Sequence, residues 1–405
     1  MTNRRSHRCG PLAATIMLGA WAAWSAVAGV ALAEQTFVRL TTHGSGYQRG
    51  LQQGRQLAAV IHTVLDEGHG KSTLGLAGRP EALRRLLRSV QGLAQGQELI
   101  DEMQGIAEGA GVPFARIAAF NLGFSVPAPA CSIVLLPDTA DGPLLVNTND
   151  DNPDYAKRVR DPRVLRIDYP AAGHAMAFHS LPGTVWAYRG VNQQGLAVGG
   201  ASGRLRDPGR NSDGLLSAVA LRYALQFLDN TEQAVRFFET HRAVGKPANL
   251  ALLDRLGEAA ILESAPCALG VRRGRGREPL FATNYFQTDV FPPFVDDSAS
   301  ARNARDRYRR IGELLAGAGS RNLAFAQRLV CDKNEGRPGQ LCQDNPVMRT
   351  LSANICACRS AAFYSYHAHP ADCQPERVEF ERGPKPAQGA LPPPNPEVLR
   401  LTSTD

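Results

Sequence analysis

Several features that would assign a chain to a function class at once are missing from this 405-residue sequence. Beyond residue 33 no apolar run is long enough to cross a bilayer. The chain also has no large excess of one charge: it contains 45 Lys and Arg and 38 Asp and Glu, and the formal net charge is +7. This balance gives no case for a nucleic-acid partner. We find no internal repeat, and the nine histidines form no recognisable partner motif for a catalytic cysteine.

Cysteine is absent between Cys9 and Cys131, and the remaining six cysteines all follow in the C-terminal part of the chain. They are Cys267, Cys331, Cys342, Cys356, Cys358 and Cys373. In an exported protein these six are predicted to form three disulfides, whose connectivity the sequence does not determine. A metal site is the alternative, because two of the six are separated by one residue, but that spacing is not the usual one for zinc. Cys131 is then left as an odd thiol.

The first 33 residues are typical of a secretory signal peptide. Three arginines precede the Ala-rich apolar stretch 12–32, and the segment ends in the small-residue sequence Ala31-Leu32-Ala33. An uncleaved membrane anchor is the alternative. We predict removal before Glu34, export to the periplasm or the medium, and no membrane attachment afterwards.

In the remaining chain the predicted secondary structure changes at Cys131, from mostly helices to mostly strands. Residues 34–130 are predicted to be mostly helical, with apolar residues at helical spacing over 50–65, 80–107 and 114–122. Strands are predicted at 131–136, 143–147, 164–167, 175–178, 184–189, 195–200, 249–253, 259–263, 364–369 and 377–381. Helices are predicted at 215–227, 231–240 and 303–315. The Pro-rich tail spans 384–405, and its segment 384–396 is predicted to be extended or mobile. This order favours antiparallel sheets covered by helices over alternating β-α units.

Cys131 follows a stiff lead-in, Pro127–Ala130, and opens a predicted strand. It is a buried inert thiol, half of a disulfide, or a nucleophile. A papain-like cysteine usually opens a helix and has a histidine partner, which does not fit this position. If the chain is cut between Ala130 and Cys131, the new α-amine, with a reference pKa of about 7.7–8.0, can accept the thiol proton. An N-to-S acyl shift followed by hydrolysis would make that cut.

Three segments carry a resemblance to a known family. They are Tyr47–Gly54 (YQRGLQQG), Glu102–Pro113 (EMQGIAEGAGVP) and Cys131-Ser132 with the hairpin that follows. The chain resembles the acyl-CoA:isopenicillin N acyltransferase-like family of autoproteolytic acyltransferases and hydrolases, which is related to the choloylglycine hydrolases. The resemblance implies an α+β chain with the N-terminal nucleophile hydrolase fold, a four-layer αββα sandwich. Residues 34–130 would be a helical prosegment or light chain, and residues 131–383 the catalytic heavy chain.

The resemblance also implies partners for Cys131. The family has an aspartate near the nucleophile, in an Asn-x-Asp-aromatic pattern. The segment Asn147–Pro153 matches this pattern only in part, because the aromatic residue is missing. Asp150 fits by its spacing from Cys131, and Asp151 fits if Asn149 is the family's asparagine. An Asx-rich turn with solvated carboxylates is the alternative.

Three asparagines and one arginine complete the predicted site. Asn249 begins a predicted strand and resembles a family position that supplies an amide to the oxyanion. Asn192, in a Gly-x-Asn-x-x-Gly-Leu segment, is either a substrate contact or a hairpin turn residue. Asn284 stands in Thr-Asn-Tyr where the family has Thr-Asn-His, and either lines the pocket or caps a loop. Arg307 resembles a helical arginine that points toward the active site, although a solvated basic helix face is the alternative.

These observations predict an exported, self-processing cysteine amidohydrolase or acyltransferase. It would act on a small acyl-amide through an S-acyl enzyme, and would need no metal and no organic cofactor. One alternative is a single-chain cysteine peptidase assisted by a histidine such as His179 or His367. The other is a catalytically inactive, disulfide-stabilised binding protein of the same fold.

Overall fold

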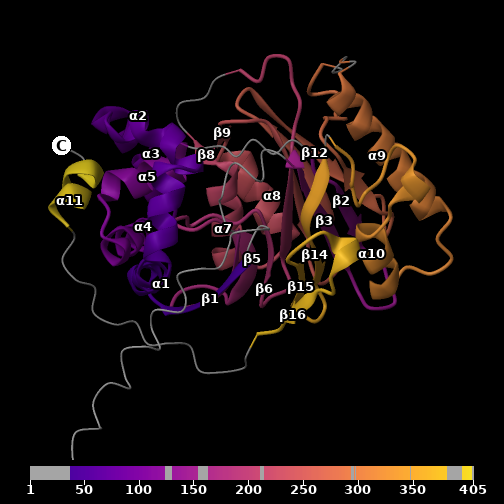
Figure 1. Cartoon of the computed structure of the whole chain (residues 1–405), viewed down its shortest axis with the longest axis horizontal. Helices are drawn as coiled ribbons and strands as arrows, with labels where there is room; N and C mark the ends of the chain where they lie inside the picture. Colours follow the sequence, from indigo (N-terminus) through magenta and orange to yellow (C-terminus); the bar gives the residue numbers. More distant parts are fainter. Residues whose placement is uncertain are drawn as a thin grey trace, which may run out of the picture. The chain divides into compact units, whose positions relative to one another are not determined.

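Two β-sheets lie face to face at the centre of the computed structural model, with helices on both outer faces (Figure 1). The structure describes residues 37–123, 130–153, 163–209, 214–292, 296, 298–346, 348–380 and 395–403. The predicted signal peptide, the lead-in residues 127–129 and the tail residues 384–394 lie outside this range. No helix within it combines the length and the apolar character needed to span a bilayer.

The first sheet has eight strands. Their spatial order is β1 (Phe37–Gly44), β4 (Arg163–Pro170), β5 (Met176–Ser180), β6 (Arg189–Asn192), β7 (Ala197–Ser202), β10 (Ala248–Leu253), β11 (Ala259–Ala265) and β12 (Ala268–Arg273). All neighbours are antiparallel except β1 and β4, which are parallel. The N-terminal segment therefore supplies an edge strand to this sheet, and this strand was not predicted.

The second sheet has six antiparallel strands. Their order is β13 (Leu280–Ala282), β2 (Ile133–Leu136), β3 (Leu144–Asp151), β14 (Arg349–Ala357), β15 (Ala362–Tyr366) and β16 (Glu376–Val378). A further parallel pair consists of β8 (Leu215–Leu216) and β9 (Ala243–Val244). The hairpin predicted after Cys131 is confirmed as β2 and β3, and the hairpin predicted at residues 249–263 as β10 and β11.

Helices cover the outer face of each sheet. The first sheet is covered by α7 (Ser217–Phe227), α8 (Thr231–Thr240) and the N-terminal group α1 (Gly46–Asp66), α2 (Leu74–Ala77), α3 (Pro80–Gln91), α4 (Gln97–Ala110) and α5 (Phe114–Gly123). The second sheet is covered by α9 (Ala299–Ala316) and α10 (Leu323–Val330). The short 3₁₀ helices are His69–Thr73, Asn334–Gly336 and Pro370–Asp372. The predicted four-layer αββα sandwich is confirmed.

Strand alternation assigns each side chain to a layer. On β3, Leu145 faces the other sheet, whereas Leu144 and Val146 face α10. Because successive strand residues point to opposite faces, the odd-numbered residues of β3 face the space between the sheets. The same parity places the side chain of Cys131 between the sheets, in the core that contains Ile133.

The two N-terminal motifs are the contact surfaces of α1 and α4. Gly50 of α1 lies so close to α4 that an added Cβ would come within 2.0 Å of the backbone oxygen of Glu102. Gly105 of α4 meets the backbone of Tyr47 in the same way, at 2.2 Å. Glycine at these positions allows the two helix backbones to touch, so the YQRGLQQG and EMQGIAEGA segments form one packing unit.

Two predictions about helices need correction. The single helix predicted over 80–107 is two helices, α3 and α4, separated by a turn around Gly92 and Gly96. The tail 384–405, for which no helix was predicted, ends in one, because residues 396–402 form α11 (Pro396–Thr402). Its Val398 and Leu401 join the core of the N-terminal helices, and Glu397 accepts the backbone N–H of Phe114 at 2.9 Å.

The predicted disulfides are absent, because all seven cysteines of the described part of the chain are free thiols. Cys356 and Cys358 share one face of the β14 segment and point into the core between the sheets. Cys331 and Cys373 pack on the opposite side of that sheet, and Cys267 is exposed. The sheet thus separates these groups of thiols. Among the described residues no cluster of three or more His, Cys, Asp and Glu is suited to hold a metal ion.

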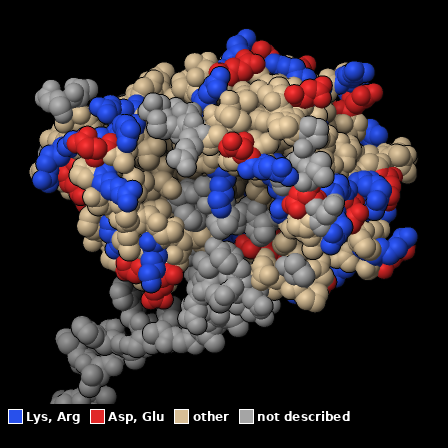
Figure 2. Space-filling view, turned by 90° about the horizontal axis from the view of Figure 1, so that it is seen from above, with Lys and Arg blue, Asp and Glu red and all other residues tan. Residues whose placement is uncertain are grey.

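The surface charges are mixed in sign. Figure 2 shows basic and acidic side chains interspersed over the face seen from above. The ion pairs at the protein surface include Arg309 with Asp306 and Arg277 with Asp138. Such pairs contribute little to stability individually.

Candidate active site

Cys131 lies just before β2, where the chain already runs beside β3. The backbone N–H of Asp150 donates to the carbonyl of Ala130 at 2.9 Å, and that of Thr148 donates to the carbonyl of Ser132 at 3.0 Å. The peptide bond between Ala130 and Cys131 is therefore fixed against the sheet. Cys131 itself is 1% exposed.

Arg307 brings a charged donor to the backbone of Cys131. This residue of α9 is buried, and its Nη1 donates to the Cys131 carbonyl at 2.6 Å and to Ser132 Oγ at 2.9 Å. Its Nη2 donates to Asn284 Oδ1 at 2.7 Å, and its Nε to Asn303 Oδ1 at 2.9 Å. Of the arginines on this helix, the structure thus directs the predicted one at the backbone of Cys131.

Asp150 is buried behind the backbone of Cys131. Its two carboxylate oxygens accept hydrogen bonds from Thr350 Oγ1 and Gln343 Nε2, each at 2.7 Å. Burial raises the pKa of this carboxyl, and the nearby Arg307 and the two hydrogen bonds oppose that rise. The parity of β3 directs Asp150 to the same side of the sheet as Ser132 and Arg307.

Asp151 points to the other side of β3, into the space between the sheets, as the Cys131 thiol does. Its Oδ1 accepts the backbone N–H of Asn152 at 2.7 Å. Burial raises the pKa of Asp151 to about 6. The two aspartates considered from the sequence therefore have different surroundings: Asp150 lies with the Cys131 backbone and Asp151 on the thiol side.

Asn284 contacts the nitrogen that self-cleavage would release. Its Oδ1 accepts the backbone N–H of Cys131 at 3.2 Å, and its Nδ2 donates to the carbonyl and Oγ of Ser202 at 2.9 and 3.0 Å. Asn249 stands behind it: its Nδ2 donates to the carbonyls of Thr283 and Tyr285 at 2.9 and 3.3 Å. In this arrangement Asn249 holds the loop that carries Asn284.

Asn192 lies in the hairpin between β6 and β7. Its Oδ1 accepts the N–H groups of Gln194 and Leu196, both at 3.0 Å, and its Nδ2 donates to the carbonyls of Leu225 and Leu228 at 3.0 and 2.9 Å. These four bonds occupy the side chain, so the structure does not bring Asn192 to the other site residues. A role in substrate binding stays a prediction.

The Cys131 thiol has no histidine partner among the described residues. Burial raises its pKa, as does Asp150, while Arg189 and Arg307 lower it. His179 contacts Ser365 Oγ at 2.6 Å through Nε2, and burial holds its pKa well below 6.5. His367 instead faces Glu376 at 3.3 Å. A histidine-assisted thiol is therefore not supported by these contacts.

Several residues that complete the site were not predicted. Thr350 and Gln343 come from a stretch of the sequence without a motif, and only the fold brings them to Asp150. Arg189 belongs to a segment that was singled out for Asn192. One signal in the sequence could have identified Arg189. It is a charged residue two positions before Val191 on the same strand, and Val191 is buried between the sheets, so Arg189 faces the same space.

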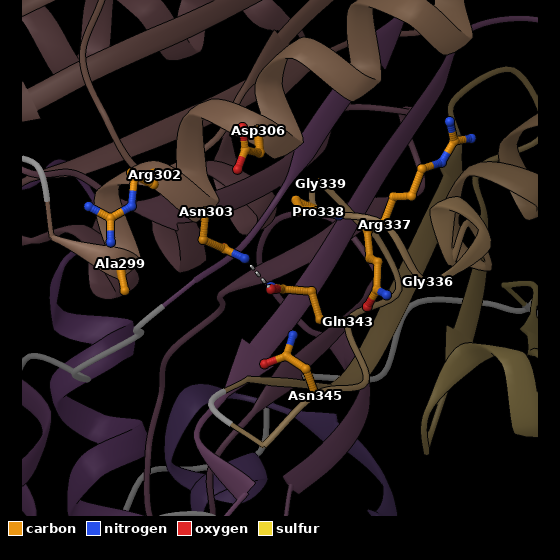
Figure 3. Close-up of a pocket in the computed structure, with 11 residues that line it drawn as sticks. Ala299, Arg302, Asn303, Asp306, Gly336, Arg337, Pro338, Gly339, Gln343 and Asn345 are labelled. Carbon is orange, nitrogen blue, oxygen red and sulfur yellow. Dashed lines mark hydrogen bonds between the residues drawn. The ribbon is translucent and has the colours of Figure 1, made fainter.

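A polar pocket of about 350 Å³ adjoins this network (Figure 3). Asn303 Nδ2 donates to Gln343 Oε1 at 2.8 Å in its wall, and Figure 3 shows Asn345 and Arg302 nearby. Asn303 also accepts from Arg307, and Gln343 also donates to Asp150. A continuous chain of hydrogen bonds thus connects the pocket wall with the Cys131 carbonyl.

Comparison with known proteins gives one strong match. The family model "Acyl-coenzyme A:6-aminopenicillanic acid acyl-transferase" matches residues 139–370, which is more than half of the chain. The matched range includes Asp150, Asn249, Asn284 and Arg307 and begins shortly after Cys131. No curated protein matches the chain.

Three of the solved structures that match with weaker likeness are named as a hydrolase, an acylase and an amidase. A conjugated bile acid hydrolase mutant from Clostridium perfringens has 9% identity and a TM-score of 0.40, covering 62% of this chain and 97% of its own. A penicillin V acylase from Agrobacterium tumefaciens has 16% identity and a TM-score of 0.33, covering 58% and 82%. The Caenorhabditis elegans ortholog of N-acylethanolamine-hydrolyzing acid amidase has 12% identity and a TM-score of 0.37, covering 56% and 93%.

Proposed function

Because the chain belongs to the acyl-coenzyme A:6-aminopenicillanic acid acyltransferase family, we propose that it is a self-processing cysteine amidohydrolase of the N-terminal nucleophile type. The observation that carries this proposal is the setting of Cys131. Its N–H donates to Asn284, its carbonyl accepts from Arg307, and the peptide bond before it is clamped to β3. Buried backbone groups need partners at any residue, but here a buried guanidinium and a side-chain amide supply them in place of a neighbouring strand.

Self-cleavage would begin with attack of the Cys131 sulfur on the carbonyl carbon of Ala130. The carbonyl oxygen already accepts the N–H of Asp150, which polarises it and can stabilise the developing oxyanion. A C–S bond forms, the C–N bond breaks, and the proton goes to the Cys131 nitrogen. Water then hydrolyses the thioester, which leaves a carboxylate on Ala130 and restores the thiol.

The released α-amine would serve as the base in turnover. It accepts the thiol proton, the sulfur attacks the acyl-amide carbonyl, and the proton passes to the leaving amine. Asn284 Oδ1 is placed to accept a hydrogen bond from this amine, and Asp150 lies on the same side. The S-acyl enzyme is resolved by water, or by an amine in the transferase case. We favour hydrolysis, because acyl-CoA is not expected outside the cytoplasm.

Export remains part of the proposal and rests on the sequence of residues 1–33. An N-terminus at Glu34 on protein recovered from the periplasm or the medium would support it. After cleavage the light chain would stay bound, since β1 pairs with β4 along eight residues and the N-terminal helices share a core with the first sheet.

Acyl-enzyme trapping tests the catalytic proposal. Processed protein is mixed with a chromogenic acyl anilide, quenched in acid and digested, and the peptide that begins with Cys131 is expected to carry the acyl mass. Cys131→Ala should be uncut and inactive, whereas Cys267→Ala, an exposed free cysteine, is the matched control and should behave as wild type. Amide cleavage that survives alkylation of Cys131 would refute the mechanism, and binding without turnover would favour the inactive protein.

A further inference from the structure

Arg189 is a buried guanidinium whose hydrogen bonds are largely unmade. It is 3% exposed and lies on β6, and its Nη2 donates to Asn149 Oδ1 at 2.9 Å. Its Nε and Nη1 have no hydrogen-bond partner, and no carboxylate forms an ion pair with it in the described part of the chain. Burying a cation in this way is costly unless another group compensates for it.

Three other buried arginines have more partners than Arg189. Arg166 and Arg222 each contact both Glu102 and Asp168 at 2.7–3.3 Å. Arg307 has four hydrogen bonds to the backbone and side chains around Cys131. Arg222 also has an Nε without a hydrogen-bond partner, but two carboxylates neutralise it. Among these four residues Arg189 has the fewest partners in the described part of the chain, with one hydrogen bond and no carboxylate.

The position of Arg189 is on the thiol side of the site. Val191, two residues later on the same strand, packs in the core between the sheets together with Cys131, so Arg189 faces the same space. Its one partner, Asn149, belongs to the opposite sheet and precedes Asp150. The Nδ2 of Asn149 also has no hydrogen-bond partner among the residues that the structure describes. Unused donors from both sheets thus meet beside the nucleophile.

The charges around Cys131 are unbalanced. Among the described residues, the guanidinium groups that influence the thiol or the two aspartates are Arg163, Arg189 and Arg307, against the carboxyls of Asp150 and Asp151. Burial raises the pKa of both carboxyls, which disfavours their negative charge further. His179, the cross-strand neighbour of Arg189, adds no negative charge. An anionic ligand would balance this site.

We propose that Arg189 is a specificity-determining residue that binds a carboxylate of the substrate, close to the scissile amide. The inference rests on the proposed function and names its substrate class: N-acyl amino acids rather than neutral amides. The carboxylate of an amino acid is separated from the amide nitrogen by a single carbon. It can therefore reach Arg189 while the sulfur of Cys131 attacks the acyl carbonyl, and the Asn149 amide can donate to the same group.

A matched substrate pair tests this proposal. The kcat/KM values of N-octanoylglycine and its neutral carboxamide are measured for wild type, Arg189→Gln and Arg189→Lys, with Arg310→Gln as the control on the outer helix layer. Wild type and the control are expected to prefer the acid by at least about 100-fold. The neutral carboxamide would leave the buried guanidinium without a charged partner, and sites reject substrates that leave a buried polar group unpaired. Arg189→Gln should reduce this preference to roughly unity, and Arg189→Lys should retain part of it. A preference that is unchanged in Arg189→Gln, or absent in wild type, would overturn the proposal.

Two further readouts separate this proposal from the one on which it rests. An uncut and inert wild-type chain would refute the proposed function. Calorimetric binding of N-octanoylglycine to wild type and Arg189→Gln then still decides for Arg189: binding lost in the variant supports it, and equal or absent binding overturns it. If Arg189→Gln does not fold, the acid-to-amide ratio of Arg189→Lys is expected to fall about 10-fold, and an unchanged ratio would overturn the proposal.

Discussion

Replacing Glu102 by glutamine should weaken the junction between the N-terminal helices and the sandwich. Glu102 of α4 has no exposed surface and contacts three guanidinium groups: Arg166 at 2.7 Å, Arg49 at 3.0 Å and Arg222 at 3.1 Å. Two of these arginines belong to the proposed heavy chain. The carboxylate therefore neutralises positive charge contributed by both proposed chains.

The size of the effect follows from the pKa of Glu102. Burial alone raises this pKa, but Arg166, Arg222 and Arg49 outweigh it and lower the pKa from 4.5 to about 2. A shift of this size corresponds to about 3 kcal/mol of folding free energy, and breaking buried ion pairs costs a similar amount, about 3–5 kcal/mol. A lowered carboxyl pKa stabilises the fold above pH 4.5, and the contribution is lost as pH falls toward 2.

Chemical denaturation measures this contribution. At pH 7 the free energy of unfolding of Glu102→Gln should be about 3 kcal/mol below that of wild type, and at pH 3 the difference should shrink to about 1 kcal/mol. Glu98→Gln is the matched control, one turn earlier on α4 and partly exposed, with a 3.4 Å contact to Arg49. It should cost less than about 1 kcal/mol. Equal losses in the two variants, or a difference independent of pH, would refute the reasoning.

Three more variants probe the site itself. Arg307→Gln removes the charged donor to the Cys131 carbonyl and should slow self-cleavage and kcat by about 100-fold or more, measured by gel and single-turnover rates. Thr350→Val removes one hydrogen bond to Asp150 and should lower kcat about 10-fold with little change in KM. Asp151→Asn should raise the free energy of unfolding at pH 8 by roughly 1–2 kcal/mol, since the raised pKa of about 6 disfavours the ionised folded state; the gain should vanish below pH 4.

The sequence predicted the layers of this fold better than its details. Period-2 and helical patterns identified both hairpins and most helices because each has one apolar face. The edge strand β1 was missed because its exposed residues alternate with buried ones that include Thr42 and Gly44, which are not apolar. The long strand β14 was missed for a related reason: it carries buried Thr350, Ser352 and Asn354.

The site residues likewise differ in whether the sequence could predict them. Cys131, Asp150, Asn284 and Arg307 could be predicted, because each stands in a segment with a recognisable pattern, and the structure brings them together. Gln343 could not, since it is distant in sequence from Asp150 and meets it only through the pairing of β3 with β14.

The cysteines show the limit of composition. An even number of cysteines in a chain predicted to be exported predicted disulfides, but composition does not reveal on which side of a sheet each thiol lies. The i, i+2 spacing of Cys356 and Cys358 fits a strand with one buried face, which is where the structure has them.

The central claim is that the α-amine of Cys131 becomes the base for its own thiol, and the mass of the purified active protein tests it most directly. We expect two polypeptides, the second beginning Cys131-Ser132-Ile133, and a single uncut polypeptide for Cys131→Ala. An active preparation that contains only one unbroken chain through Ala130 and Cys131 would contradict the account.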